Sequence, residues 1–178
     1  VFYEMIDNID LLESQYQVIR GRWPESYNEM VFVLTDPSAI TDYMAYALGL
    51  KNPGALDSIM DDISSGQTVE SVSDLEQWTY DDLLNVDLRL VDVTDLYRYN
   101  EEYAIWEDLS ANTAHMKTVI ENGTPLKIVG IVCAKEGANA TALSSGVAYT
   151  ADLTRHVVAV AQDSPIVKAQ LENEEVDV

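Results

Sequence analysis

The chain has 178 residues, with 31 Asp or Glu against 10 Lys or Arg, so its formal net charge at pH 7 is -21. A surface with this charge repels nucleic-acid phosphates and anionic lipid headgroups, which disfavours nucleic-acid binding and favours cationic partners or metal ions. Hydrophobic residues make up 47% of the chain, as in ordinary globular proteins with one domain or two small lobes.

The N-terminal part of the chain predicts a short helix followed by two strands. Asn8 is a suitable N-cap for a helix over residues 9–15, because its side chain can accept from a free backbone N–H of the first turn. Strand-like runs follow at 16–20 and 30–35. The second run is apolar throughout, as expected for a strand covered on both faces. Gly21 opens the connection between the two strands.

The middle of the chain predicts three helices and one strand. Apolar residues at helical spacing favour helices over 43–48 and 53–63. A third helix over 78–84 has Thr79 as its capping residue and two aspartates in its first turn, where the helix dipole favours negative charge. Residues 86–93 alternate between apolar and polar types, which is typical of a half-exposed strand.

The C-terminal part predicts two strands and three helices. A helix over 110–121 stops at Asn122-Gly123, and an apolar strand over 126–133 follows. A short strand over 147–149 precedes a pair of helices over 152–161 and 165–171. Helices and strands therefore mix irregularly along the chain, which favours the α+β class.

Several short blocks of sequence, most of them near the two ends of the chain, form an ordered series. They read GRWP at 21–24, NEMVFV at 28–33, ITDYMAYALGL at 40–50, LKIVGIV at 126–132, GVAYTADLT at 146–154 and SPIVKAQ at 164–170. This series resembles the extracytoplasmic domain of FtsX-like (MacB-type) ABC transporter permeases, most of all those of Gram-positive bacteria.

The resemblance implies a fold of two lobes, in the manner of the MacB-like periplasmic core domain. One lobe, the scaffold, would combine residues 1–52 with 124–178, and residues 53–123 would form an inserted lobe. The chain lacks an apolar run of the length that spans a bilayer and a recognisable signal peptide, so we expect a soluble piece of a longer protein. The resemblance places transmembrane helices on both sides of this piece, which would lie on the extracellular side of the cell membrane.

The resemblance also implies a non-catalytic function. Such a domain binds or steers a substrate or partner protein and is coupled, through the transmembrane region, to an ABC ATPase in the cytoplasm. The alternative is an extracellular sensor or adaptor domain that binds a cationic peptide or a cell-wall enzyme without transport. A secreted hydrolase is disfavoured, because no nucleophile elbow, zinc-protease motif, phosphate-binding loop or dinucleotide fingerprint is found.

Residue types that carry chemistry are few and widely spaced. His115 and His156 are the only histidines, Cys133 is the only cysteine, and none of them has metal-ligand spacing to another. The calcium-loop pattern is absent, so acidic groups such as Asp81-Asp82 are interpreted as solvated surface, and the alternative is a weak divalent-cation site. We therefore expect no enzyme activity, no metal site and no cofactor.

One stretch in the predicted inserted lobe is a candidate partner-binding site. Residues 96–106 are rich in aromatic side chains and have few turn signals. The candidate site residues are Tyr97, Tyr99, Tyr103, Trp106, Glu101 and Glu102, with Glu107 and Asp108 alongside. Exposed rings edged by carboxylates would suit a peptide with cationic and apolar residues. The alternative is that these rings pack the core of their own lobe.

Overall fold

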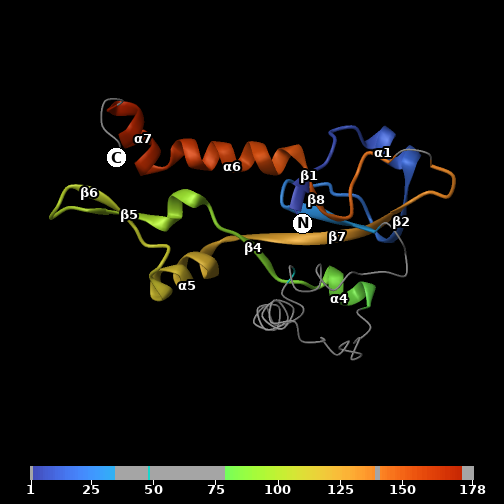
Figure 1. Ribbon diagram of the computed structural model, residues 1–178, viewed down its shortest axis with the longest axis horizontal. Coiled ribbons are helices and arrows are strands. Elements are labelled where there is room, and N and C mark those ends of the chain that lie inside the picture. The colour runs from blue at the N-terminus through green and yellow to red at the C-terminus, as the bar shows by residue number, and fades with distance from the viewer. Residues whose placement is uncertain (1, 35–47, 49–78, 139–140, 174–178) are drawn as a thin grey trace, which may run out of the picture.

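A six-stranded mixed sheet is the centre of the fold, and its strands follow the order β1-β8-β3-β7-β2 with β4 paired to β7 (Figure 1). The computed structural model describes residues 2–34, 48, 79–138 and 141–173. The sheet consists of β1 (Phe2–Glu4), β2 (Tyr16–Gly21), β3 (Glu29–Leu34), β4 (Leu88–Leu90), β7 (Thr124–Ala134) and β8 (Gly146–Tyr149). The fold is therefore α+β, as predicted. The helices predicted over 43–48 and 53–63 lie outside the described residues, except for Leu48.

Strands from the two ends of the chain pair with each other in this sheet. β3 runs parallel to β7 and antiparallel to β8, while β1 runs parallel to β8. The two apolar strands predicted from the sequence, β3 and β7, thus lie side by side, because Met30 pairs with Ile128 and Val33 pairs with Val132. β4 comes from the range predicted as an inserted lobe, and it pairs antiparallel with the N-terminal end of β7. The division into two lobes stays a prediction.

The helices over 9–15 and 80–84 begin after the predicted caps Asn8 and Thr79, whereas the helix predicted over 110–121 begins later, at Thr113 after the cap Asn112. The described helices are α1 (Ile9–Gln15), α4 (Tyr80–Leu84), α5 (Thr113–Asn122), α6 (Ala151–Asp163) and α7 (Pro165–Glu172), with a 3-10 helix η1 (Val93–Leu96). Asn8 accepts a hydrogen bond from the Leu11 N–H at 3.0 Å, and Thr79 forms a capping box with Asp82.

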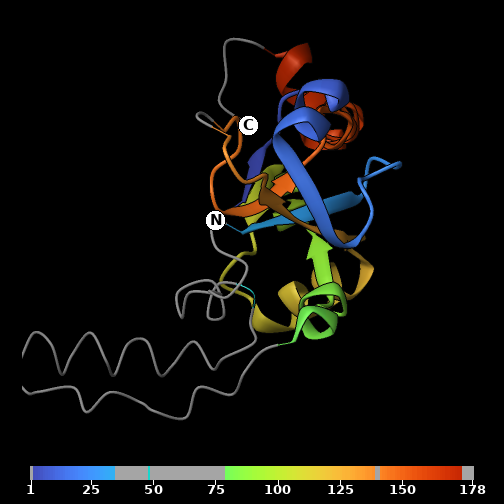
Figure 2. The ribbon, with the colours of Figure 1, turned by 90° about the vertical axis from the view of Figure 1, so that its right-hand side faces the viewer.

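The core lies on both faces of the sheet, and β3 is buried from Met30 to Leu34. Its alternate residues Met30 and Phe32 pack in one cluster with Leu83 of α4, and Leu48 and Ile128 complete that cluster. On the other face Val31 and Val33 pack with Leu12 of α1, Tyr16 and Val132. Figure 2 shows α1 and α4 on opposite sides of the strands. The prediction that this apolar run is a strand covered on both faces is therefore confirmed.

Two glycines allow the end of β2 to approach β7 closely. Gly21 has a φ of +74°, and a Cβ atom there would lie 2.1 Å from the carbonyl oxygen of Val129. On the opposite strand, a Cβ atom on Gly130 would lie 2.0 Å from the carbonyl oxygen of Arg22. Arg22 N–H donates to that same Val129 oxygen at 3.0 Å. Neither position has room for a larger residue without movement of the backbone.

The strand predicted over 86–93 is shorter than the alternation suggested. Only Leu88–Leu90 pairs as β4, and η1 begins at Val93. Asp92 ends the strand, because its Oδ1 accepts from the Thr94 N–H at 3.0 Å and from the Thr94 hydroxyl at 2.7 Å. This local capping bond turns the backbone out of the sheet.

Beyond β4 the chain forms an arm at one end of the molecule. Strands β5 (Tyr97–Asn100) and β6 (Ile105–Asp108) form a separate two-stranded hairpin, which is followed by α5. In Figure 1 the arm extends to the left, and α6 and α7 extend in the same direction above it, while α1 and β2 lie at the opposite end.

Candidate functional site

All six candidate site residues lie on the β5–β6 hairpin (residues 97–108). Tyr97 and Tyr99 lie two residues apart on β5, and Tyr99 pairs with Trp106 of β6. The rings of this pair are 5.4 Å apart and tilted, a favourable aromatic geometry. Tyr97, Tyr99 and Tyr103 are 36%, 47% and 65% exposed, whereas Trp106 is half-buried. The three tyrosine rings are thus open to solvent at the end of the arm.

The hairpin turns through residues 101–104, a turn that sequence reasoning missed. Asn100 forms it: its side-chain Oδ1 accepts from the N–H groups of Glu102 at 3.0 Å and Tyr103 at 3.3 Å. Its Nδ2 also donates to Glu107 on the opposite strand at 2.8 Å. Ala104 completes the turn with a φ of +52°. Asn100 was the available signal, because Asn side chains favour such turns.

Carboxylates outnumber cations on the hairpin. Glu101 and Glu102 are exposed in the turn, Glu107 and Asp108 lie on β6, and Arg98 is the basic residue of the hairpin. The pKa of Asp108 is lowered because the Ser110 N–H and then the Ser110 hydroxyl hydrogen-bond to its carboxylate. The hairpin thus presents rings and negative charge together.

An apolar groove lies between α6 and the β4–β7 pair, and nothing in the sequence analysis indicated it. We call it the α6 groove, and its volume is about 440 Å³. Its walls include Leu88, Leu90, Leu126, Tyr149, Val157 and Val158. Arg89 and Thr154 also line it. Such a volume lies within the usual range of ligand sites.

A smaller cavity of about 70 Å³ continues this groove towards the arm. It shares Leu90 and Val157 with the α6 groove and is also lined by Asp92, Asp95 and Val160. We call Asp92 and Asp95 the acidic end of the groove. The groove was missed because its two sides are about 65 residues apart in the sequence and only the fold brings them together.

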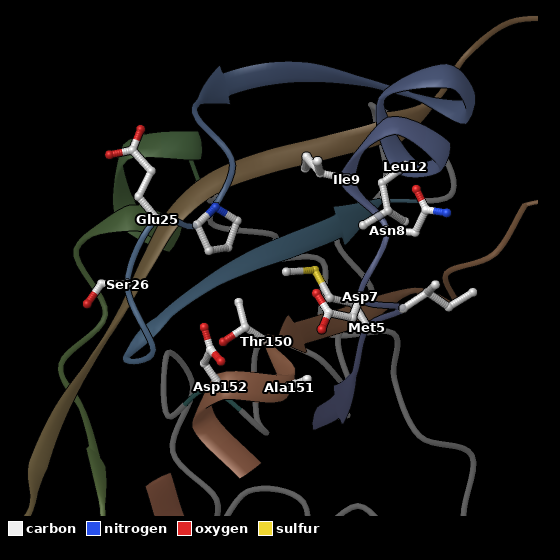
Figure 3. Close-up of a pocket in the computed structure, with 12 residues that line it drawn as sticks. Met5, Asp7, Asn8, Ile9, Leu12, Glu25, Ser26, Thr150, Ala151 and Asp152 are labelled. Atoms are coloured by element: carbon white, nitrogen blue, oxygen red, sulfur yellow. The ribbon is translucent and has the colours of Figure 1, made fainter. Parts of the chain in front are cut away.

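A third, more polar pocket of about 270 Å³ lies at the N-terminus of α6 (Figure 3). Its lining includes Asp7, Glu25, Thr150 and Asp152. The Thr150 hydroxyl oxygen is buried and has no hydrogen-bond partner among the described residues. Arg155 donates to Asp152 at 2.5 Å and to Asp7 at 3.2 Å, so two of the three carboxylates are already neutralised by a guanidinium.

The other side chains that could take part in chemistry are the single cysteine and the two histidines. Cys133 is buried in β7 as a free thiol. The His156 ring stacks on Tyr27 with centroids 4.2 Å apart, and His115 Nε2 lies 2.9 Å from the backbone oxygen of Asp95. Within the described ranges, no group of three or more His, Cys, Asp or Glu side chains is arranged to hold a metal ion. No helix among these residues has the length and apolarity needed to cross a membrane.

Comparison with known proteins finds no family model, no curated protein and no solved structure that matches this chain. The resemblance to FtsX-like permease domains therefore stays a prediction.

Proposed function

We propose that this chain is a non-catalytic extracytoplasmic domain of an FtsX-like ABC transporter permease, with a MacB-like lobe, and that it binds or steers a substrate or partner protein. The observation that carries the binding role is the β5–β6 hairpin, where three exposed tyrosines lie among four carboxylates. The permease assignment rests on the sequence blocks at the two ends of the chain.

The hairpin chemistry favours a cationic partner with some apolar side chains. Carboxylates on a chain of net charge -21 attract cations over about one Debye length, roughly 8–10 Å at physiological salt. Aromatic rings then supply contact area at a small entropic cost, because each ring has only two side-chain torsions to fix. The hydrogen bonds of Asn100 to the turn and to Glu107 hold the two strands in one arrangement before a partner arrives.

In a permease, the domain would respond to the ATPase through the flanking transmembrane helices. Its scaffold lobe would transmit movement of those helices to the bound partner, as in a hinge transition. The protein would then act at the extracellular side of the cell membrane. This part of the proposal is tested by the reading frame on either side of residues 1–178: transmembrane segments on both sides support it, and their absence from a complete frame rejects it.

The binding role is tested by titrating the domain with a fluorescein-labelled peptide that contains lysine and leucine, at 20 mM and then 300 mM salt. We expect binding that weakens at high salt, because exposed charges are screened. Replacing Tyr99→Ala and Trp106→Ala together should weaken binding about tenfold, since aromatic residues commonly dominate such contacts.

The matched control replaces Trp23→Ala, a half-buried aromatic residue between β2 and β3 that packs against the cluster of Leu12 and Val31 on the other face of the sheet. Equal affinity for the hairpin variant and the wild type, with both proteins folded, would place the partner site elsewhere. No binding at 20 mM salt would reject the cationic-partner role.

A further inference from the structure

The α6 groove exposes aliphatic side chains that no described element covers. Val158 and Val160 of α6 are 49% and 42% exposed, although both belong to groove walls. α6 extends in the same direction as the arm (Figure 1), and its residues Leu153 and Val157 line the groove together with Leu88 of the sheet. Val158 and Val160 lie two residues apart, so they project from different sides of the helix, Val158 into the α6 groove and Val160 into the smaller cavity. Exposed aliphatic side chains in the walls of a concave apolar groove indicate a binding surface.

The charges around the groove select the class of occupant. Arg89 is the cation in the groove wall, and its Nε donates to Asp87 at 3.2 Å. At the acidic end, Asp92 is buried and its Oδ1 already accepts two hydrogen bonds from Thr94, whereas Asp95 is exposed and has no ion-pair partner among the described residues. The groove is therefore apolar along its length, neutral at Arg89 and negative at one end. A second copy of this chain is a poor occupant, because both copies carry -21.

We infer that the α6 groove binds an amphipathic helical segment of the cationic partner, with its aliphatic side chains in the groove and a lysine or arginine at the acidic end. This inference rests on the proposed function, because it assigns the apolar part of the same partner. A volume of about 440 Å³ accommodates several aliphatic side chains of the kind that a helix presents at positions i, i+3, i+4 and i+7. A cation at the acidic end would pair with the exposed carboxylate of Asp95 and meet the negative charge of the buried Asp92 behind it.

The groove and the hairpin then divide the recognition between them. The hairpin supplies exposed rings and negative charge on the arm. The groove lies between α6 and β4, next to the arm. It would select partners whose apolar side chains have helical spacing. Peptides with the same charge but without aliphatic residues should bind the hairpin alone.

The test uses two labelled 14-residue peptides with the same number of lysines, one with leucines at helical spacing and one with serines in their place. Fluorescence anisotropy gives the affinity of each peptide for the wild type and for Val158→Ser, Val160→Ser and Asp95→Asn. Val18→Ser and Asp10→Asn are matched controls, because Val18 is 38% exposed on β2 and Asp10 is exposed on α1, away from the groove. Thermal melting confirms that each variant is folded.

We expect Val158→Ser and Val160→Ser each to weaken the affinity for the leucine peptide about fivefold. The affinity for the serine peptide should change less than about twofold. Asp95→Asn should weaken both the affinity for the leucine peptide and its salt dependence, whereas the two controls leave them unchanged. If the groove variants match the controls but the hairpin variant still loses binding, the groove inference is wrong and the proposed function stands. If the leucine peptide does not bind the wild type at low salt, both are rejected.

Discussion

Arg22 and Glu29 close the loop between β2 and β3 with a pair of parallel hydrogen bonds. Arg22 Nη1 donates to Glu29 Oε2 at 2.8 Å, and Arg22 Nη2 donates to Oε1 at 2.7 Å. Glu29 also accepts from the backbone N–H groups of Glu25 at 2.8 Å and Ser26 at 3.2 Å. One carboxylate therefore holds both the guanidinium and the turn of the loop, which is a charge-assisted arrangement stronger than an ordinary surface pair.

The Glu29 carboxylate makes stability depend on pH in acid. The Arg22 hydrogen bond is the largest cause, and together with the backbone N–H groups and the Arg22 charge it lowers the pKa of Glu29 from 4.5 to about 2, against the opposing effect of burial. A carboxyl whose pKa is lower in the folded state stabilises that state above its unfolded pKa and loses this effect as pH falls through the folded pKa. The window is therefore from about pH 5 down to about pH 2.

We expect Glu29→Gln to lower the free energy of unfolding at pH 7 by about 1 to 2 kcal/mol, a figure reduced because the Arg22 side chain is 45% exposed. Urea denaturation at pH 7, 5, 4, 3 and 2 measures it, and the difference from wild type should shrink through the acid window. Glu25→Gln is the control, because Glu25 is 75% exposed and lies 3.9 Å from Arg22. A difference that stays constant from pH 7 to pH 2 would contradict this account.

β7 is the element that joins the parts of the sheet. It spans eleven residues and pairs with β3 and β2 from the first part of the chain and with β4 from the middle. Its central residues Ile128 and Ile131 are 2% and 0% exposed. A disruption of β7 should therefore unfold the whole sheet rather than one edge.

Ile128→Asp would bury a carboxylate that has no cation to pair with, in the cluster formed with Met30 and Leu83. We expect a loss of about 3 to 5 kcal/mol in the free energy of unfolding, read as a lower melting temperature. The control Val18→Asp, on the exposed edge strand β2, should cost less than about 1 kcal/mol. An unchanged melting temperature for Ile128→Asp would show that the strand does not pack in the core.

At the scale of the element, sequence reasoning succeeded where the signal is local. The caps Asn8 and Thr79 and the apolar run of β3 are each decided by neighbouring residues, so their elements were predicted nearly to the residue. It failed at Asp92, where a side-chain hydrogen bond ends a strand that alternation alone would continue. It also missed the hairpin turn, because Asn100 was outweighed by the aromatic residues around it.

The candidate site could be predicted only in part. The aromatic and acidic residues of the hairpin are contiguous in sequence, so their grouping was visible without a structure. The α6 groove was not visible, because Leu90 and Val157 meet only when β4 and α6 are placed by the sheet. Apolar residues on α6 gave the ordinary signal of a helix face and did not indicate that part of this face is open.

At the scale of the whole molecule, the features proposed for binding gather at one end. The hairpin and the exposed part of α6 extend in the same direction from the sheet, while the loop held by Arg22 and Glu29 follows β2 (Figure 1). The net charge of -21 acts over the whole surface, so charge alone attracts a cationic partner without directing it to this end. The tyrosine rings and the apolar groove must therefore determine that the partner binds at this end of the molecule.

Mapping of backbone amide shifts by NMR, as the leucine-lysine peptide is added to the isotope-labelled domain at 150 mM salt, tests this account most directly. We predict that the largest changes fall on the β5–β6 hairpin and on α6 around Val157 and Val158, with small changes on α1 and α4. Changes spread evenly over all acidic residues, or largest on α1 or α4, would contradict it.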